Sequence, residues 1–326
     1  MIDINLIKIV KEIGYGMYGT VYEGLYENEK IALKIEKIPE SHLDENLKYL
    51  EWREIYFSLK FANSYPDFFI KLLGYDIIDD CDLVQKYTTD IDSMPGDVKK
   101  LLLEKKESKY CIRKAYSYVE TTLKKILETL NKKEIYSMLL QVIIMIYLMQ
   151  KHNYTHNDLH GENIGANKLD GDKVIKFKNK DIYLRGYQYY CIDYGLVLNP
   201  IFNLSKDEEK KFKKNYKHEI NKILSRLVYF EKPTIKKLIP YEFNKDLYKR
   251  IKNNDNFVKL NEITKSKTDK FILYQILYPG EFQKIYFGDK YTELNNPIIR
   301  IDIDDLIYIF KHKQSMKKII YYLADK

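Results

Sequence analysis

Cysteine and tryptophan are scarce in this sequence of 326 residues, which contains three cysteines and one tryptophan. The cysteines, Cys81, Cys111 and Cys191, are odd in number and widely spaced. This pattern indicates neither a disulfide framework nor a zinc site, and it is typical of a protein in a reducing compartment. The class of small secreted domains held together by disulfides is therefore excluded.

Long hydrophobic runs are also missing. The most apolar stretch, residues 138–149, is too short to cross a bilayer and contains Gln141. The N-terminal residues MIDINLIKIV include an acid at position 3 and no cleavable apolar segment, so we expect no signal peptide. The sequence predicts a soluble intracellular protein without a membrane segment.

The composition is that of an ordinary globular protein, with 45% hydrophobic and 31% charged residues. The net charge is +8, but acidic and basic residues are interspersed. A lysine-rich, solvated surface explains this charge, and residues 210–217 fit the exposed face of a helix. No stacking or groove-binding motif accompanies the charge, so no specific nucleic-acid site is predicted. The oligomeric state is left open.

The pattern of hydrophobic residues predicts an α+β protein with two lobes. Strands are expected at 6–13, 20–26, 30–35, 69–78, 82–87 and 110–118, and one helix at 43–61. The polar stretch 88–109 is expected to be an inserted loop with a short helix. From residue 120 helices predominate, with predicted helices at 122–130 and 134–152, strand-like runs at 173–177 and 187–192, and a further helix beginning near Ser205. We therefore expect lobes at 1–119 and 120–326.

Closely spaced glycines lie between the first two expected strands. Residues 14–21 read Gly-Tyr-Gly-Met-Tyr-Gly-Thr-Val, a GxGxxGxV pattern. Glycine lets the backbone approach a polyphosphate and present its N–H groups without obstruction. A strand rather than a helix follows, which argues against a dinucleotide fingerprint, and no Gly-Lys-Ser/Thr ends the loop as it would in a P-loop. The alternative is a hairpin turn that happens to contain glycines.

The third expected strand carries a lysine among apolar residues, in the run Ile-Ala-Leu-Lys at 31–34. Burying Lys34 is costly unless an anion pairs with it. ATP phosphates would supply that anion, and a carboxylate on the following helix would hold the lysine. Glu54 is the predicted partner, with Glu51 one turn earlier as the alternative. A lysine that points from an edge strand to solvent is the other interpretation.

The densest polar motif is Tyr-Thr-His-Asn-Asp-Leu-His-Gly-Glu-Asn-Ile at 154–164, between a long apolar helix and a strand. In a phosphotransferase, Asp158 would take or orient the proton of the attacking hydroxyl, and Asn163 would bind Mg²⁺ through its amide oxygen. His156 and His160 are four residues apart, but the residues between them favour a loop over a helix, so zinc is not expected. The alternative is a polar turn whose side chains satisfy the backbone.

A fourth motif, Cys-Ile-Asp-Tyr-Gly at 191–195, ends an expected strand. The carboxylate of Asp193 would hold a metal that touches the β- and γ-phosphates. A simple Asp-x-Gly turn is the alternative. The four motifs agree in order and context, and together they predict ATP- and Mg²⁺-dependent phosphotransfer.

In these motifs the sequence resembles the protein-kinase-like superfamily over about its first 200 residues. The resemblance implies an antiparallel-sheet lobe with one main helix, a mostly helical lobe, and ATP in the cleft with adenine near residues 118–121. It implies Lys34, Glu54 and Asp158 as catalytic residues, with Asn163 and Asp193 as metal ligands. The nucleotide contacts that it implies are Ile13, Gly14, Tyr15, Gly16, Gly19, Val21, Ala32, Lys34 and Val119.

The sequence is similar, more narrowly, to divergent serine/threonine kinases of large cytoplasmic DNA viruses, through its 156–163 loop and the long hairpin expected before Asp193. This would place it in host cytoplasm or a virion. Asn157 stands where regulated kinases usually have arginine, so we expect activity that does not depend on activation-loop phosphorylation. Asp193 follows Asn163 by thirty residues, a gap lengthened by the inserted hairpin. No Ala-Pro-Glu follows Gly195, so we expect the peptide-docking segment of protein kinases to be truncated or replaced here.

Three functions compete. The leading prediction is a kinase that phosphorylates serine or threonine of a protein substrate. A small-molecule kinase of the choline or aminoglycoside type also lacks a peptide-docking segment, but the intact glycine loop and the run at 31–34 favour a protein kinase. A nucleotide-binding pseudokinase would normally have lost Lys34, Asp158, Asn163 or Asp193, and all four are present.

Overall fold

The computed structural model describes residues 1–16, 19–81, 94, 96–224, 228–229, 243–287, 298–299 and 301–326. These residues form two units, one made of 1–121 and 190–204 and the other of 122–189 and 205–326. The protein is α+β, with an antiparallel sheet in its N-terminal region and a helical C-terminal part. Residues 190–204, which we expected in the second lobe, belong to the first unit.

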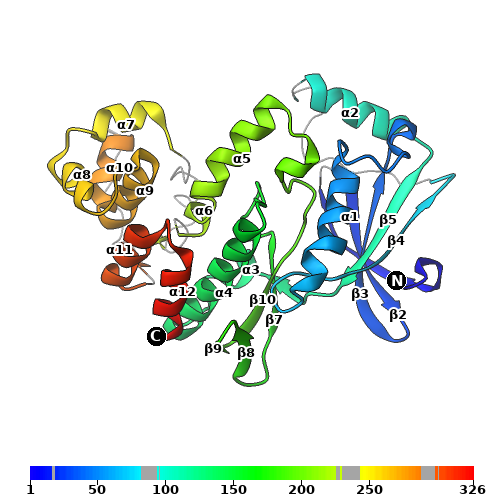
Figure 1. Ribbon diagram of the computed structural model, residues 1–326, viewed down its shortest axis with the longest axis horizontal. Helices are drawn as coiled ribbons and strands as arrows, with labels where there is room; N and C mark the ends of the chain where they lie inside the picture. Colours follow the sequence, from blue (N-terminus) through cyan, green and yellow to red (C-terminus); the bar gives the residue numbers. More distant parts are fainter. Residues whose placement is uncertain are drawn as a thin grey trace. The chain divides into compact units, whose positions relative to one another are not determined.

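Unit 1 is built on a five-stranded antiparallel sheet of order β1-β2-β3-β5-β4 (Figure 1). Its strands are β1 (Lys8–Gly16), β2 (Gly19–Tyr26), β3 (Glu29–Lys37), β4 (Leu72–Ile78) and β5 (Cys111–Ser117). The expected strand at 82–87 lies outside the described residues. Five of the six expected strands are therefore present, with shifted ends.

The two faces of this sheet differ in chemistry because side chains alternate along a strand. On one face, Ile31, Leu33 and Ala115 form a core cluster with Ile4 from the short helix η1 (Ile4–Leu6). Cross-strand pairing places Val21, Lys34 and Lys114 together on the opposite face. This second face therefore carries charge into the interior of the unit.

Two helices of unit 1 complete it. Helix α1 (Leu50–Lys60) lies along the sheet in Figure 1, and α2 (Gly96–Glu107) precedes β5. We expected α1 to begin at residue 43, which is wrong. Glu45 has a φ of 54°, a left-handed conformation that interrupts a right-handed helix.

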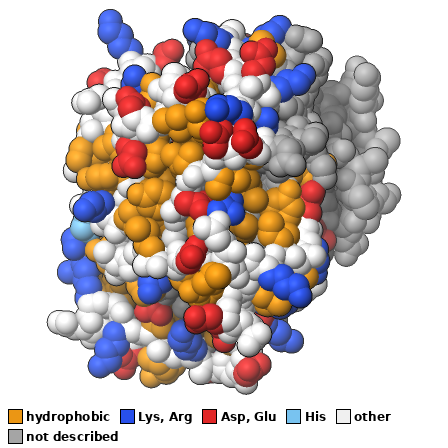
Figure 2. Space-filling view, turned by 90° about the vertical axis from the view of Figure 1, so that its right-hand side faces the viewer, with side chains coloured by type: hydrophobic (Ala, Val, Ile, Leu, Met, Phe, Trp, Pro, Cys, Tyr) orange, Lys and Arg blue, Asp and Glu red, His pale blue; other side chains and the backbone are white. Residues whose placement is uncertain are grey.

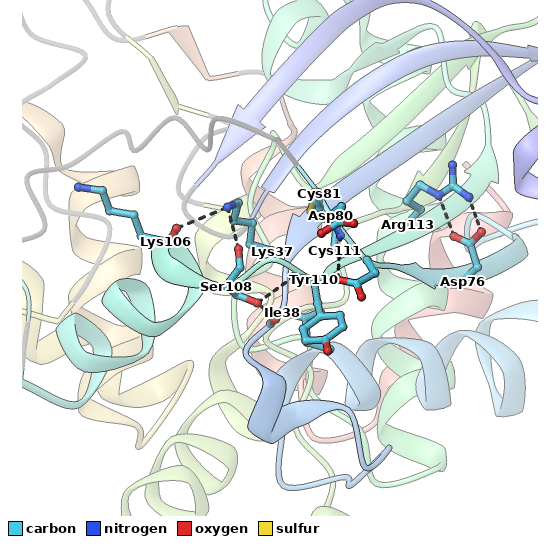
Figure 3. Close-up of a disulfide and its surroundings, with 11 residues drawn as sticks. Lys37, Ile38, Asp76, Asp80, Cys81, Lys106, Ser108, Tyr110, Cys111 and Arg113 are labelled. Atoms are coloured by element: carbon cyan, nitrogen blue, oxygen red, sulfur yellow. Dashed lines mark hydrogen bonds and ion pairs between the residues drawn. A yellow bond between two sulfur atoms is a disulfide. The ribbon is translucent and has the colours of Figure 1, made fainter.

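The cysteine pattern was also misjudged. Cys81 and Cys111 form a disulfide with their Cα atoms 5.6 Å apart (Figure 3), and Cys191 is buried and takes no part in a disulfide. The pair forms because β4 runs antiparallel to β5, with Ile78 opposite Cys111. The disulfide closes the inserted segment that contains α2, and it removes the support that cysteine spacing gave to a reducing compartment.

Unit 2 contains the long helix α4 (Lys132–Lys151), most of whose residues are buried. A capping box begins it: the Asn131 side chain accepts from the Glu134 N–H, and Glu134 accepts in turn from the Asn131 N–H. The helix expected at 122–130 is shortened to α3 (Leu123–Ile126). A second capping box, between Ser205 and Glu208, begins α5, as the sequence predicts.

The strands of unit 2 are short. They are β6 (Thr121–Thr122), β7 (Ile164–Lys168), β8 (Lys173–Phe177), β9 (Lys180–Leu184), β10 (Tyr187–Cys191), β11 (Val228–Tyr229) and β12 (Ile298–Ile299). Strands β8 and β9 form the hairpin between β7 and β10 that the sequence predicts. The last two residues of β10 and the first residue of β6 belong to unit 1.

The remaining helices of unit 2 all follow α4 in the sequence. They are α5 (Lys206–His218), α6 (Asn221–Leu224), α7 (Lys245–Ile251), α8 (Asp255–Lys259), α9 (Lys267–Leu277), α10 (Pro279–Phe287), α11 (Ile303–His312) and α12 (Met316–Ala324). Helix α5 buries none of its residues, as expected for the lysine-rich stretch 210–217. Among the residues described here, no helix is long and apolar enough to cross a membrane.

Acidic and basic side chains are mixed on the face of the molecule shown in Figure 2, with hydrophobic side chains between them. No single sign of charge dominates that face. This agrees with the charges of the sequence, which are interspersed apart from the lysine-rich stretch 210–217. The net charge of +8 is therefore not concentrated on this face.

Candidate functional site

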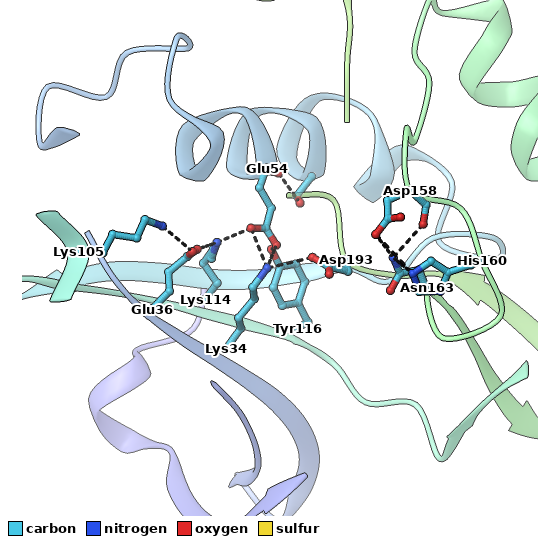
Figure 4. Close-up of polar contacts among 11 residues, drawn as sticks. Lys34, Glu36, Glu54, Lys105, Lys114, Tyr116, Asp158, His160, Asn163 and Asp193 are labelled. Atoms are coloured by element: carbon cyan, nitrogen blue, oxygen red, sulfur yellow. Dashed lines mark hydrogen bonds and ion pairs between the residues drawn. The ribbon is translucent and has the colours of Figure 1, made fainter. Parts of the chain in front are cut away.

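Lys34 is the centre of an ion-pair cluster in unit 1. Its Nζ lies 3.0 and 3.1 Å from the two carboxylate oxygens of Glu54 and 3.0 Å from Oδ1 of Asp193 (Figure 4). Burial alone would lower the pKa of Lys34, but the charges of Asp193 and Glu54 outweigh it and raise that pKa well above its usual value. Lys34 therefore stays charged at any physiological pH.

Glu54 lies on α1 and receives hydrogen bonds from three side chains. Besides Lys34, Lys114 of β5 donates to Oε2, and the Tyr116 hydroxyl donates to Oε1 at 2.9 Å. Burial would raise the pKa of Glu54, but Lys114 and Lys34 outweigh burial and lower it. Glu51, the alternative partner of Lys34, instead pairs with Lys105 at 2.6 Å and contacts His42 at 3.3 Å.

Asp193 reaches this cluster because the next residue anchors its backbone. Tyr194 is fully buried, and its hydroxyl donates to the carbonyl oxygens of Ile70, at 3.1 Å, and Cys191, at 2.7 Å. Its ring packs on Phe57 of α1 with centroids 4.8 Å apart. Asp193 itself has a φ of 56°, a strained conformation for a non-glycine residue and one typical of functional sites. Its side chain is 52% exposed, so the carboxylate faces solvent as well as Lys34.

The glycine motif spans the β1–β2 hairpin, of which Met17 and Tyr18 lie outside the described residues. A Cβ on Gly19 would lie 2.6 Å from the carbonyl oxygen of Ile35, so packing requires glycine there. A Cβ on Gly14 or Gly16 would meet nothing within 4 Å, and neither has a positive φ. The fold itself does not require these two glycines, which leaves the close approach of a ligand as a reason for them.

The remaining predicted nucleotide contacts lie in unit 1. Val21 pairs with both Gly14 and Lys34 across the sheet, and Ala32 shares the face of Lys34. Val21, Ala32 and Val119 are half-buried, while Ile13 and Tyr15 of β1 are exposed. These positions offer partly exposed apolar surface on the strands that carry the glycines and the lysine.

Asp158 and Asn163 are joined in unit 2. The Asn163 amide nitrogen donates to the Asp158 carbonyl oxygen at 2.9 Å and to its carboxylate at 3.2 Å, and His160 Nε2 lies 3.4 Å from the same carboxylate (Figure 4). Because its nitrogen is committed to Asp158, Asn163 would use its amide oxygen to hold a cation. The Asp158 side chain is 38% exposed.

The loop that carries Asp158 is held in place by Glu219, a residue that the sequence analysis did not identify. The N–H of Asn157 donates to Glu219 Oε1 at 2.8 Å, and the Asn215 side chain donates to the Asn157 amide oxygen. Asn157 has a φ of 65°, so this contact stabilises a strained backbone. His156 is completely buried in the same loop. Glu219 follows α5, where its only sequence signal is an acid beside the apolar Ile220.

Lys114 and Tyr116 also escaped sequence reasoning. Both lie on β5, which is central in the sheet and buried on both faces. A signal was present, because a lysine within a strand otherwise apolar enough to be central needs a buried anion, as argued for Lys34. The missing information was which glutamate it would meet.

The described residues contain no group of three or more histidine, cysteine, aspartate or glutamate side chains arranged to hold a metal. Mg²⁺ needs less from a protein, since it is commonly held by one or two carboxylates together with substrate phosphates. Asp193 in unit 1 and Asn163 in unit 2 are donors of the required oxygen type.

No protein-family model matches the chain, and a search of curated proteins finds no match. The functional interpretation therefore depends on the residues and their geometry. The strongest elements of that geometry are the Lys34 cluster and the Asp158–Asn163 pair.

Proposed function

We propose that this protein is an ATP- and Mg²⁺-dependent phosphotransferase with a protein-kinase-like fold, and that it phosphorylates a serine or threonine hydroxyl of a protein substrate. One observation carries the proposal: the Lys34 ammonium lies 3.0 Å from both Glu54 and Asp193. A charged lysine between a buried and a half-exposed carboxylate is suited to bind phosphate while a metal occupies the exposed carboxylate.

The residues present fit both ATP and Mg²⁺. Gly14 and Gly16 leave open space above the backbone, where a phosphate would accept N–H hydrogen bonds. Lys34 supplies the positive charge, and Asp193 and Asn163 supply hard oxygen ligands. Bound Mg²⁺·ATP would supply the phosphoryl group and partly neutralise its charge.

The chain's own residues would then divide the work. Glu54 holds Lys34 in position, and Lys34 orients the phosphates. Asp158 orients the acceptor hydroxyl and takes its proton, and Asn163 restrains the Asp158 carboxylate through its amide nitrogen. The proposal requires these two sets of residues to act on one nucleotide.

The test is incubation of the protein with γ-labelled ATP and Mg²⁺ in the presence of a basic protein, an acidic protein, or a panel of cholines and aminoglycosides. Wild type should label one of the proteins, and Asp158→Asn should lose at least ~10²-fold in rate through loss of the base and its positioning. Lys99→Met on helix α2, a change at a residue that belongs to neither set, is the matched control. Full phosphotransfer by the Asp158→Asn variant would refute the mechanism.

One observation favours a small-molecule acceptor as the second candidate. Only residues 196–205 separate Gly195 from α5, and they hold the short helix η5 (Pro200–Phe202). This leaves little chain to dock a peptide. Labelling of a choline or aminoglycoside, with both proteins unlabelled, would select this candidate. ATP binding without transfer to any acceptor would instead indicate a pseudokinase.

A further inference from the structure

The Lys34 cluster continues into the interior of unit 1 as a chain of alternating charges (Figure 4). We call it the buried charge chain, and its members in order are Lys34, Glu54, Lys114, Glu36, Lys105 and Glu51. Every neighbouring pair in this order forms an ion pair. All six side chains are buried or nearly so, so none of these charges can rely on water for compensation.

Lys114 is the residue of the buried charge chain that connects Glu54 to Glu36. It is directly opposite Lys34 in the β3–β5 register, it is 0% exposed, and it bridges Glu54 and Glu36. Lys105, on α2, is equally buried and shares Glu36, but its second partner is Glu51 rather than Glu54. The two lysines therefore differ mainly in whether they touch Glu54.

The positive charge of Lys114 acts on Glu54 and, through Glu54, on Lys34. With Lys34 as its only cation, Glu54 would compete directly with any phosphate for the charge of Lys34. Because Lys114 also neutralises Glu54, more of the charge of Lys34 stays directed towards Asp193 and towards an entering anion. Lys114 and Tyr116 together also keep Glu54, and with it α1, in place when Lys34 moves to a ligand.

We propose that Lys114 is a positioning residue, which fixes Glu54 and through it the direction of Lys34. The claim that this matters for phosphotransfer rests on the function proposed above. A purely structural role, in which Lys114 only balances buried charge, makes the opposite prediction: Lys105 and Lys114 should then be interchangeable in their effects.

The first experiment compares Lys114→Met with Lys105→Met in steady-state phosphorylation at varied ATP. Lys114→Met should lower kcat by about 10- to 100-fold, the range typical of residues that orient a group in contact with the reacting atoms. KM for ATP should change less, because nucleotide binding is shared among many contacts. Lys105→Met should leave kcat unchanged. Equal kcat values for the two variants would overturn the proposal.

A second comparison can be made even if the Lys114→Met variant does not fold. Glu36→Gln with Lys114→Met removes one charge of each sign from the chain, and Glu36→Gln alone is its control. Amide hydrogen exchange in α1, measured without nucleotide, should be faster in the double variant than in the control, because Glu54 has lost its second cation. Equal exchange in α1 would overturn the positioning role.

The two claims fail separately. If wild type transfers no phosphate to any acceptor, the proposed function falls, while the exchange of α1 still decides whether Lys114 fixes Glu54. If wild type is active and the variants show no difference, the function stands and the role of Lys114 falls.

Discussion

Replacing Lys34 and replacing Glu54 should have very different effects on stability, although the two residues form one ion pair. In Lys34→Met, Glu54 keeps Lys114 and the Tyr116 hydroxyl as donors. Asp193 loses its ion pair with Lys34, but its side chain is 52% exposed and can be hydrated. Lys34 itself is only 13% exposed, but the carboxylate that it leaves at Asp193 is half-exposed and Glu54 keeps two donors. The free energy of unfolding should therefore fall by no more than about 1 kcal/mol, the upper end for partly exposed pairs.

Glu54→Gln removes the only negative charge between Lys34 and Lys114. Lys114 is completely buried, and its remaining partner Glu36 is shared with Lys105. An uncompensated buried charge of this kind typically costs about 3–5 kcal/mol. The difference between the two variants should therefore be about 2–5 kcal/mol, with Glu54→Gln the less stable.

Acidification provides an internal check on this reasoning. The pKa of Glu54 is lower in the folded protein than its unfolded value of 4.5. Its contribution to stability is therefore present above pH 4.5 and is lost as the pH falls through the lowered folded value. The difference in the free energy of unfolding between wild type and Glu54→Gln should be complete at neutral pH and should become smaller below pH 4.5.

The assay is urea denaturation followed by circular dichroism at pH 7 and at several lower values. Lys30→Met is the matched control, since Lys30 lies on the same strand but is exposed and pairs with Glu23. Lys34→Met should resemble this control in stability while losing phosphotransfer. If Lys34→Met is as unstable as Glu54→Gln, then Lys34 rather than Lys114 holds Glu54, and the account of the cluster is wrong.

Three further predictions concern other parts of the molecule. Burial would raise the pKa of Asp269, but a hydrogen bond from His218 and the charge of Lys313 outweigh burial and lower this pKa from 3.8 to about 2. Asp269→Asn should therefore lower the free energy of unfolding by about 2 kcal/mol at pH 7, as measured by urea denaturation. This difference should disappear as the pH falls from about 4 to 2, and a difference that does not depend on pH would contradict the shift. Burial lowers the pKa of Lys313, which opposes the stabilising effect at Asp269. The net contribution of the Asp269–Lys313 pair to stability should therefore be smaller than about 2 kcal/mol. Cys81→Ser should cost about 3–4 kcal/mol in thermal unfolding, because the disulfide closes a separation of 30 residues, and equal stability of variant and wild type under non-reducing conditions would argue against the bond. Phosphatase treatment should leave ATP turnover unchanged, because Asn157 provides no cation for a phosphorylated loop; loss of turnover on treatment would refute this.

Sequence reasoning worked best where the relevant chemistry is local. The sequence predicted a helix beginning near Ser205, and a capping box between Ser205 and Glu208, which lie within one helical turn, begins α5 there. The motif at 154–164 predicted a loop that carries both Asp158 and Asn163, and in the structure a hydrogen bond joins these two side chains. It worked less well for α1, where the left-handed backbone at Glu45 could not be read from hydrophobic spacing.

The amino-acid sequence by itself determined the α+β character, the positions of most strands of unit 1, and the need of a lysine in an apolar strand for a charged partner. These follow from local periodicity and from residue types whose burial is costly without a partner. The sequence also predicted Glu54 as the partner of Lys34, but only the tertiary structure decided the other partners. Lys114 and Glu54 are 60 residues apart, Asn157 and Glu219 are 62 apart, and both pairs depend on how distant segments pack. Strand register and helix packing are cooperative outcomes of the whole chain, so the cation that neutralises Glu54 could not be identified before the fold was known.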